Sequence, residues 1–136
     1  NVLAWHGRRL CIAGVECSYD LEADERKLRR VLDGKRADAF TLLLYHTPDV
    51  MPAAVRAGVD LYLAGHTHGG QLRLPWFGAI VTASRYGKRY EMGAYREGET
   101  TLYVSRGIGL EGKGAPRARF LCPPELVLFT LRGSLD

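Results

Sequence analysis

The chain has 136 residues, of which 46% are hydrophobic and 25% charged, the composition of an ordinary globular domain. Its longest apolar runs, such as "FTLLLY" at 40–45, are far shorter than the roughly 20 residues that cross a bilayer. Its three cysteines have no CxxC spacing, which argues against a disulfide framework and against a thiolate metal site.

The net charge of +4 is unevenly distributed along the chain. Residues 1–72 balance to zero, whereas residues 73–119 hold nine Arg or Lys against four Glu. Such an excess either meets an anion or is a solvated face. A nucleic-acid binder built on this stretch is disfavoured because its aromatic residues follow no stacking pattern. We therefore expect no nucleic-acid partner.

The first part of the chain predicts strands and helices in alternation. Asp20 can cap a helix that Gly34 ends, with Leu21, Leu28, Val31 and Leu32 on one face. The expected elements are a strand at 8–15, a helix at 20–34, a strand at 40–46, a short helix at 47–58 and a strand at 59–65.

These strands are continuous apolar runs, which is typical of strands covered on both faces in an α/β layered fold. After Pro75 the sequence becomes rich in Gly, Tyr and Arg, with strands expected at 100–107 and 124–132. We expect these later strands to be antiparallel or mixed and to close the edge of the sheet. In such sheets ligands bind beyond the carboxyl ends of the strands.

Three histidines lie at expected strand ends: His46 after one strand, and His66 and His68 in "LYLAGHTHGGQLRLP" at 61–75. In an extended segment residues i and i+2 project to the same side, so both rings of the pair can reach one small volume. The flanking glycines permit a sharp turn. Neutral imidazole is the commonest metal ligand in proteins, so the sequence predicts a metal site. His6 has no companion and is read as structural.

The kind of metal site is limited by charge. Three imidazoles can hold one Zn²⁺ with an open position. Two divalent ions about 4 Å apart need anionic bridging ligands as well. Asp49 and Asp60 are better read as a turn or cap residue and a strand-start residue. If the site is binuclear, its carboxylates must come from elsewhere.

Five segments taken in order carry a resemblance to a known family: "LLLYHTPDV", "LYLAGHTHGGQLRLP", "SRYGKRYEMGAYREG", "LYVSRGIG" and "RARFLCPPELVLFTL". Together they resemble the C-terminal half of bacterial calcineurin-like metallophosphoesterases, in the branch similar to lipid-precursor pyrophosphatases and membrane-associated phosphodiesterases. The resemblance implies an α/β fold, namely the C-terminal half of an αββα sandwich with a mixed sheet and flanking helices. Residues 1–136 would form one domain, the C-terminal part of the family's domain.

The resemblance also implies the site. His46 matches the histidine that binds the second metal, His66 the one beside it, and His68 the one on the first metal. His66 and His68 would be the catalytic residues, with His66 either a metal ligand or an acid near the leaving group. Two divalent ions (Mn, Fe, Zn or Co) would activate a bridging water that attacks phosphorus. The family's Asp-x-His, Gly-Asp-x-x-Asp and Gly-Asn-His-Asp motifs do not occur in the chain. We therefore expect a fragment that begins past them and is inactive alone.

Three basic residues are candidates for substrate binding. Arg85 and Lys88 can receive a phosphate or an anionic headgroup, or can be solvated edge residues, and Arg106 can clamp phosphate or pack near the site.

The expected function is hydrolysis of a phosphodiester, phosphomonoester or pyrophosphate bond in a phosphorylated small molecule or lipid-linked substrate. The alternative is a non-catalytic or partner-dependent metal-binding or regulatory module. An exposed sheet face would favour a homodimer. The compartment would be cytoplasmic, or membrane-associated through an N-terminal segment outside the chain.

Overall fold

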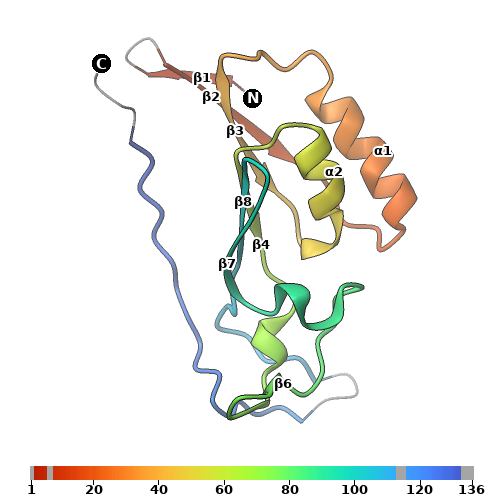
Figure 1. Ribbon diagram of the computed structural model, residues 1–136, viewed down its shortest axis with the longest axis vertical. Coiled ribbons are helices and arrows are strands. Elements are labelled where there is room, and N and C mark those ends of the chain that lie inside the picture. Colours follow the sequence, from red (N-terminus) through yellow and green to blue (C-terminus); the bar gives the residue numbers. More distant parts are fainter. Residues whose placement is uncertain (1, 6–7, 113–115, 133–136) are drawn as a thin grey trace.

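The computed structural model describes residues 2–5, 8–112 and 116–132 (Figure 1). His6 lies outside them. The strands are β1 (Val2–Trp5), β2 (Arg8–Gly14), β3 (Ala39–Leu44), β4 (Leu61–Ala64), β5 (Arg73–Leu74), β6 (Gly78–Ala79), β7 (Gly93–Glu97) and β8 (Thr100–Val104). The helices are α1 (Leu21–Leu32) and α2 (Met51–Arg56), with 3-10 turns η1 (Pro48–Val50), η2 (His68–Gly70) and η3 (Gly87–Tyr90).

Six strands form one mixed sheet in the order β1-β2-β3-β4-β8-β7, and β5 and β6 form a separate hairpin. The four inner strands run parallel, and β1 and β7 are antiparallel edges. The expected mixed α/β sheet is thus confirmed. Because β3 and β4 are parallel neighbours, the residues that follow their carboxyl ends meet at one edge of the sheet.

Helix α1 forms where the sequence predicts it. The Asp20 side chain accepts a hydrogen bond from the Ala23 N–H, which satisfies one of the free amides of the first turn. Leu28 and Leu32 are buried against the sheet. Val31 was expected on the same face but is half exposed, because the stripe that contacts the sheet is narrower than the apolar stripe of the sequence.

The two faces of the sheet differ. Both helices cover one face (Figure 1), where the core contains Ala13, Leu43, Tyr62, Leu102 and Val104. Alternate residues of β3 point to the other face, and there Phe40 and Leu44 remain 42% and 44% exposed. Both faces are apolar, as the sequence indicates, but only one is fully covered within the described residues.

The segment 124–132 is extended, but it is not the edge strand that the sequence predicts. It runs apart from the ribbon of the sheet in Figure 1 and meets the open face, where Phe129 packs edge-on against Tyr103 at 5.1 Å between ring centroids. Leu126 and Leu128 point outward and are 95% and 91% exposed. The prediction was wrong because this segment crosses a face, where its backbone cannot join the hydrogen-bond ladder of an edge strand.

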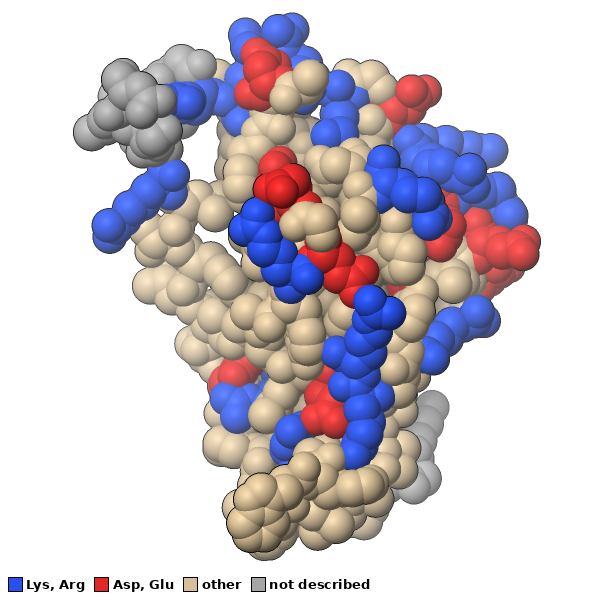
Figure 2. Space-filling model, in the orientation of Figure 1, with Lys and Arg blue, Asp and Glu red and all other residues tan. Residues whose placement is uncertain are grey.

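The long axis of the molecule has chemically different ends. On the face that Figure 2 shows, the end at which Figure 1 places β6 holds residues other than Lys, Arg, Asp and Glu, and Lys and Arg interspersed with Asp and Glu lie above it. No helix among the described residues is long and apolar enough to cross a membrane.

Candidate functional site

Two of the three predicted histidines meet beyond the carboxyl ends of β3 and β4. His66 Nδ1 lies 3.1 Å from His46 Nε2, and the ring centroids are 4.8 Å apart with an interplanar angle of 61°. The chain is drawn together here by the Gly65 N–H, which donates to the His46 carbonyl at 3.0 Å. The buried Tyr62 hydroxyl of β4 donates to the Thr47 carbonyl. Adjacent parallel strands therefore bring together residues 20 positions apart.

The surroundings of His66 indicate its tautomer. His66 Nε2 lies 3.2 Å from the Ala83 carbonyl oxygen, which can only accept a hydrogen bond. The proton therefore belongs on Nε2, and Nδ1 presents its lone pair toward His46. An imidazole whose second nitrogen donates to a backbone carbonyl is the usual arrangement of a metal-ligating histidine.

The extended geometry predicted for His66 to His68 is wrong. His66 and His68 have φ values of 69° and 49°, in the left-handed region, and Thr67 between them is α-helical. The Gly69-Gly70 pair continues this turn, also with positive φ. Left-handed backbone is uncommon for residues with a Cβ and tends to occur at functional sites. The two rings are thus aimed by a tight turn.

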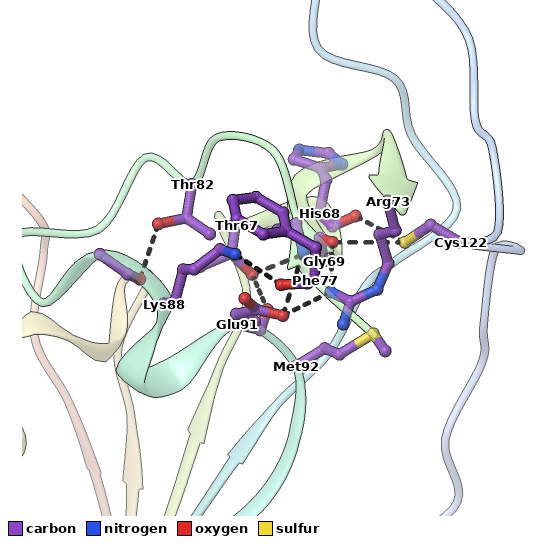
Figure 3. A network of polar contacts seen from close by, with 12 residues as sticks. Thr67, His68, Gly69, Arg73, Phe77, Thr82, Lys88, Glu91, Met92 and Cys122 are labelled. Carbon is purple, nitrogen blue, oxygen red and sulfur yellow. Dashed lines mark hydrogen bonds and ion pairs between the residues drawn. The ribbon is translucent and has the colours of Figure 1, made fainter. Parts of the chain in front are cut away.

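His68 occupies a separate position in this turn. Its carbonyl accepts hydrogen bonds from Arg119 and from the Cys122 thiol, and its ring points away from the polar network around Arg73 and Glu91 (Figure 3). His68 Nδ1 is buried and has no hydrogen-bond partner among the described residues. Burial lowers the pKa of His46, and the charges that His66 and His68 carry when protonated lower it further.

Polar contacts with neighbouring segments support the turn at 66–70. Glu91 forms an ion pair with Arg73 at 2.7 Å, and Arg73 also donates to the Gly69 carbonyl at 2.9 Å. The Thr67 hydroxyl donates to the Glu91 carbonyl at 2.7 Å. Figure 3 shows these groups converging beneath the turn. Both charged side chains of the pair are largely buried, so the turn has a rigid support.

The histidines fit a metal in part. Two nitrogens bound to one ion at about 2.0–2.1 Å, with angles near 90° to 109°, are about 2.9–3.4 Å apart, and the His46–His66 separation of 3.1 Å lies in this range. Within the described ranges, however, no group of three or more His, Cys, Asp or Glu side chains is arranged to hold an ion. The pair and the unpartnered His68 Nδ1 supply part of a ligand set and require further ligands.

The predicted substrate-binding residues lie in different surroundings. Arg85 lines a cavity of about 140 Å³ together with Tyr19, Tyr45, Thr47 and Asp49. Lys88 Nζ lies 3.1 Å above the centre of the Phe77 ring, on the β5–β6 hairpin. Arg106 binds the carboxylate of Glu125 through both Nε and Nη2, so it holds the C-terminal segment in place.

Two residues beside the site were not predicted. Tyr19 contacts both rings of the pair, with centroids 6.3 Å from His46 and 5.6 Å from His66. Its place after β2 is the available signal, since β2 ends at the same edge of the sheet. Asp24 is fully buried and accepts a hydrogen bond from Tyr45 Oη at 2.7 Å. No sequence signal distinguishes this helical carboxylate from the exposed ones around it.

A mixed α/β sheet with imidazoles beyond the carboxyl ends of neighbouring parallel strands defines a class of ligand-binding and catalytic proteins. Three curated relatives narrow the class. The chain is 44% identical over 95 residues to the uncharacterized metallophosphoesterase YkuE of Bacillus subtilis, covering 70% of this chain and 32% of that protein. It is 41% identical over 91 residues to the phosphodiesterase YaeI of Escherichia coli, with coverages of 66% and 32%.

The third relative is the UDP-2,3-diacylglucosamine pyrophosphatase LpxG of Chlamydia trachomatis, 34% identical over 94 residues, with coverages of 64% and 27%. The chain belongs to the calcineurin-like metallophosphoesterase family and spans about a third of the length of these relatives. No family model matches it. No solved structure matches it either.

Proposed function

We propose that the complete protein is a metal-dependent hydrolase of phosphoester bonds and that residues 1–136 are a single domain, the C-terminal part of its catalytic domain. The observation that carries the proposal is the 3.1 Å approach of His66 Nδ1 to His46 Nε2, with the proton of His66 directed to the Ala83 carbonyl. The printed names of the relatives, a phosphodiesterase and a pyrophosphatase, support this reaction class.

In this proposal His46, His66 and His68 hold two divalent ions (Mn, Fe, Zn or Co) together with carboxylates outside this chain. Bound ions of this kind lower the pKa of water and stabilise charge on phosphoryl oxygens. The chain's own residues fix the ligand atoms: the Ala83 carbonyl sets the tautomer of His66, and Arg119 and Cys122 hold the backbone of His68.

The substrate in this proposal is a phosphorylated small molecule or a lipid-linked phosphate. Arg85 is the best placed of the three basic candidates, because it shares a cavity with Tyr19, which contacts the histidine pair. Arg106 is already held by Glu125, and Lys88 contacts Phe77, so we assign neither to the phosphate.

The alternative, a partner-dependent metal-binding module, is favoured for the isolated chain by its lack of a three-ligand group among the described residues. The 136-residue chain should hydrolyse a generic aryl phosphodiester poorly or not at all. Stoichiometric metal and robust turnover in this chain alone would contradict the incomplete site.

The test of the function uses the complete protein. His46→Ala and His66→Ala should each weaken Mn²⁺ binding by roughly tenfold or more and lower turnover of an aryl phosphodiester, because each removes an imidazole ligand. His6→Ala, at the one histidine of the four that has no histidine companion in the sequence, is the matched control and should leave both unchanged. Unaltered metal affinity in both site variants, measured by titration calorimetry, would refute the assignment.

We further propose that a second copy of the chain covers the open sheet face when the chain is isolated. The support is the exposed apolar surface formed by Phe40 and Leu44 of β3 and by Leu126 and Leu128 of the C-terminal segment. Exposed patches of this kind mark association surfaces in soluble proteins.

A further inference from the structure

The β5–β6 hairpin presents an apolar surface to solvent at one end of the molecule. Trp76 is fully exposed at its tip, and the remaining members of the patch, Leu74, Phe77, Ile80 and Val81, are 47% to 71% exposed. Phe120 and Leu121 extend the patch, since the Phe120 carbonyl accepts from the Arg73 N–H of β5 at 3.0 Å. Large apolar groups gathered at one tip need a partner of matching chemistry.

The hairpin is held firmly against the histidine turn. Gly70 packs so closely on it that a Cβ there would overlap Ala79 of β6 and lie 2.8 Å from the Val81 carbonyl. Glu91 accepts from the Ala79 N–H at 3.4 Å and pairs with Arg73 of β5. The exposed tip is therefore a projecting part of a rigid unit that includes the candidate site.

Unpaired positive charge borders this apolar tip at Lys88. Three of the acids in residues 73–119 are bound by arginines in the pairs Arg73–Glu91, Arg89–Glu97 and Arg96–Glu99. Lys88 is exposed and forms no ion pair within the described part of the chain. Lys88 contacts the Phe77 ring and donates to the Phe77 carbonyl, so positive charge lies directly against the apolar tip. Figure 2 shows Lys and Arg, interspersed with Asp and Glu, above the tan end of the molecule.

We propose that the tip of this hairpin docks on an anionic lipid surface. Trp76 and Phe77 fit the interfacial zone of a bilayer, which aromatic side chains favour. The basic side chain of Lys88 beside them can bind anionic headgroups. The candidate site lies near this tip, since His66 Nε2 contacts the carbonyl of Ala83, two residues past Val81. The proposal does not depend on the hydrolase activity.

The test is sedimentation of the complete protein with phosphatidylcholine vesicles that do or do not contain about one-third phosphatidylglycerol. We expect binding to the anionic vesicles and little to the neutral ones. Trp76→Ser and Phe77→Ser should each weaken binding by roughly tenfold or more, because each removes a large apolar group from the contact. Val31→Ser, at a half-exposed apolar residue of α1 outside the hairpin, is the matched control and should bind normally.

Variants that remove positive charge test the electrostatic part of the proposal, the attraction to anionic headgroups. Lys88→Gln should weaken binding by roughly fivefold, the effect of one basic side chain near an anionic surface. Arg29→Gln, which removes one exposed charge from α1, should have little effect. Fluorescence gives an independent readout, because the difference in emission between the wild type and Trp76→Phe reports on Trp76. Its emission should shift to the blue on binding.

Three results would overturn the proposal. The first is no binding of the complete protein to anionic vesicles. The second is equal binding by the wild type, Trp76→Ser and Phe77→Ser. The third is self-association without vesicles that Trp76→Ser abolishes, which would assign the tip to a second copy of the protein. Trp76→Ser should keep its melting temperature because the side chain is fully exposed, so a loss of binding will not reflect unfolding.

Discussion

Asp24 is a carboxylate with no exposed surface, on a helix whose other acids, Glu22 and Glu25, are exposed and partly exposed respectively. It accepts hydrogen bonds from the Ser18 N–H and hydroxyl at 2.8 and 2.6 Å, from the Tyr45 hydroxyl at 2.7 Å and from Lys27 at 3.1 Å. Burial alone raises the pKa of Asp24, but these hydrogen bonds outweigh burial and hold the pKa below its ordinary value. Asp24 therefore fixes the loop before α1 and the residue preceding His46.

We expect Asp24→Asn to destabilise the chain by roughly 2–4 kcal/mol near neutral pH, because an amide cannot accept all these hydrogen bonds. The folded-state pKa is depressed, so this stabilisation is present above the unfolded pKa of about 3.9 and declines as the pH falls below it. Urea unfolding at pH 6 and pH 3 should show a smaller difference between wild type and variant at the lower pH.

Asp33→Asn, at the exposed C-cap of α1, is the control and should change stability by no more than about 0.5 kcal/mol. A wild-type to Asp24→Asn difference that is equal at both pH values would contradict the assigned ionisation.

At the scale of elements, the turn that carries His66 and His68 is shaped by its glycines. Gly69 and Gly70 both have positive φ, and both pack against other segments: a Cβ on Gly69 would lie 2.7 Å from Cys122 Sγ and 2.9 Å from Arg106 Cγ. Gly70 packs on the hairpin in the same way. The turn thus joins the sheet, the hairpin and the C-terminal segment without room for a side chain.

Gly70→Ala should lower the free energy of unfolding by roughly 2–4 kcal/mol, since left-handed strain and overpacking add. Gly34→Ala also places a Cβ at positive φ, but nothing lies within 4 Å of it, so only the strain of about 1 kcal/mol applies. Thermal unfolding of both variants checks the difference. Equal losses would show that contact with Ala79 and Val81 contributes nothing.

Elements with a clear period were predictable, and the site was predictable in composition but not in shape. Asp20, Leu28 and Gly34 located α1 because capping, packing and termination each leave a local signal. His66 and His68 were identified as a pair, but their left-handed turn depends on the hairpin and on residues near Cys122 that pack against the glycines. Such distant contacts leave no mark on the local pattern.

At the scale of the whole molecule, one face of the sheet lies under α1 and α2, and among the described residues the other face is crossed only by the C-terminal segment. The apolar run at 124–132 matches a buried strand in sequence. Whether such a run joins an edge or crosses a face depends on which backbone groups are free to pair, and side-chain pattern does not determine this. The tertiary environment of residues 124–132, and not their side-chain pattern, therefore determines that they do not pair as a strand.

The open face leads to a prediction about association. The isolated chain should sediment as a dimer, and Leu126→Ser with Leu128→Ser should shift it toward monomer, because both leucines present their side chains to solvent from this face. Trp76→Ser, on the β5–β6 hairpin rather than on the open sheet face, serves as the control and should leave the dimer intact. A wild-type chain that sediments as a monomer and binds no hydrophobic dye would contradict self-association through the open sheet face.

The left-handed backbone at His66 and His68 has a consequence for how stability and activity are related in this chain. Glycine adopts this conformation with less strain than histidine, so it would relax the turn while removing an imidazole. Substitutions of His66 or His68 that raise the melting temperature should also remove a candidate metal ligand. Such a trade-off between stability and activity is found at many active sites. Selection for thermal stability alone would therefore replace the histidines of this turn first.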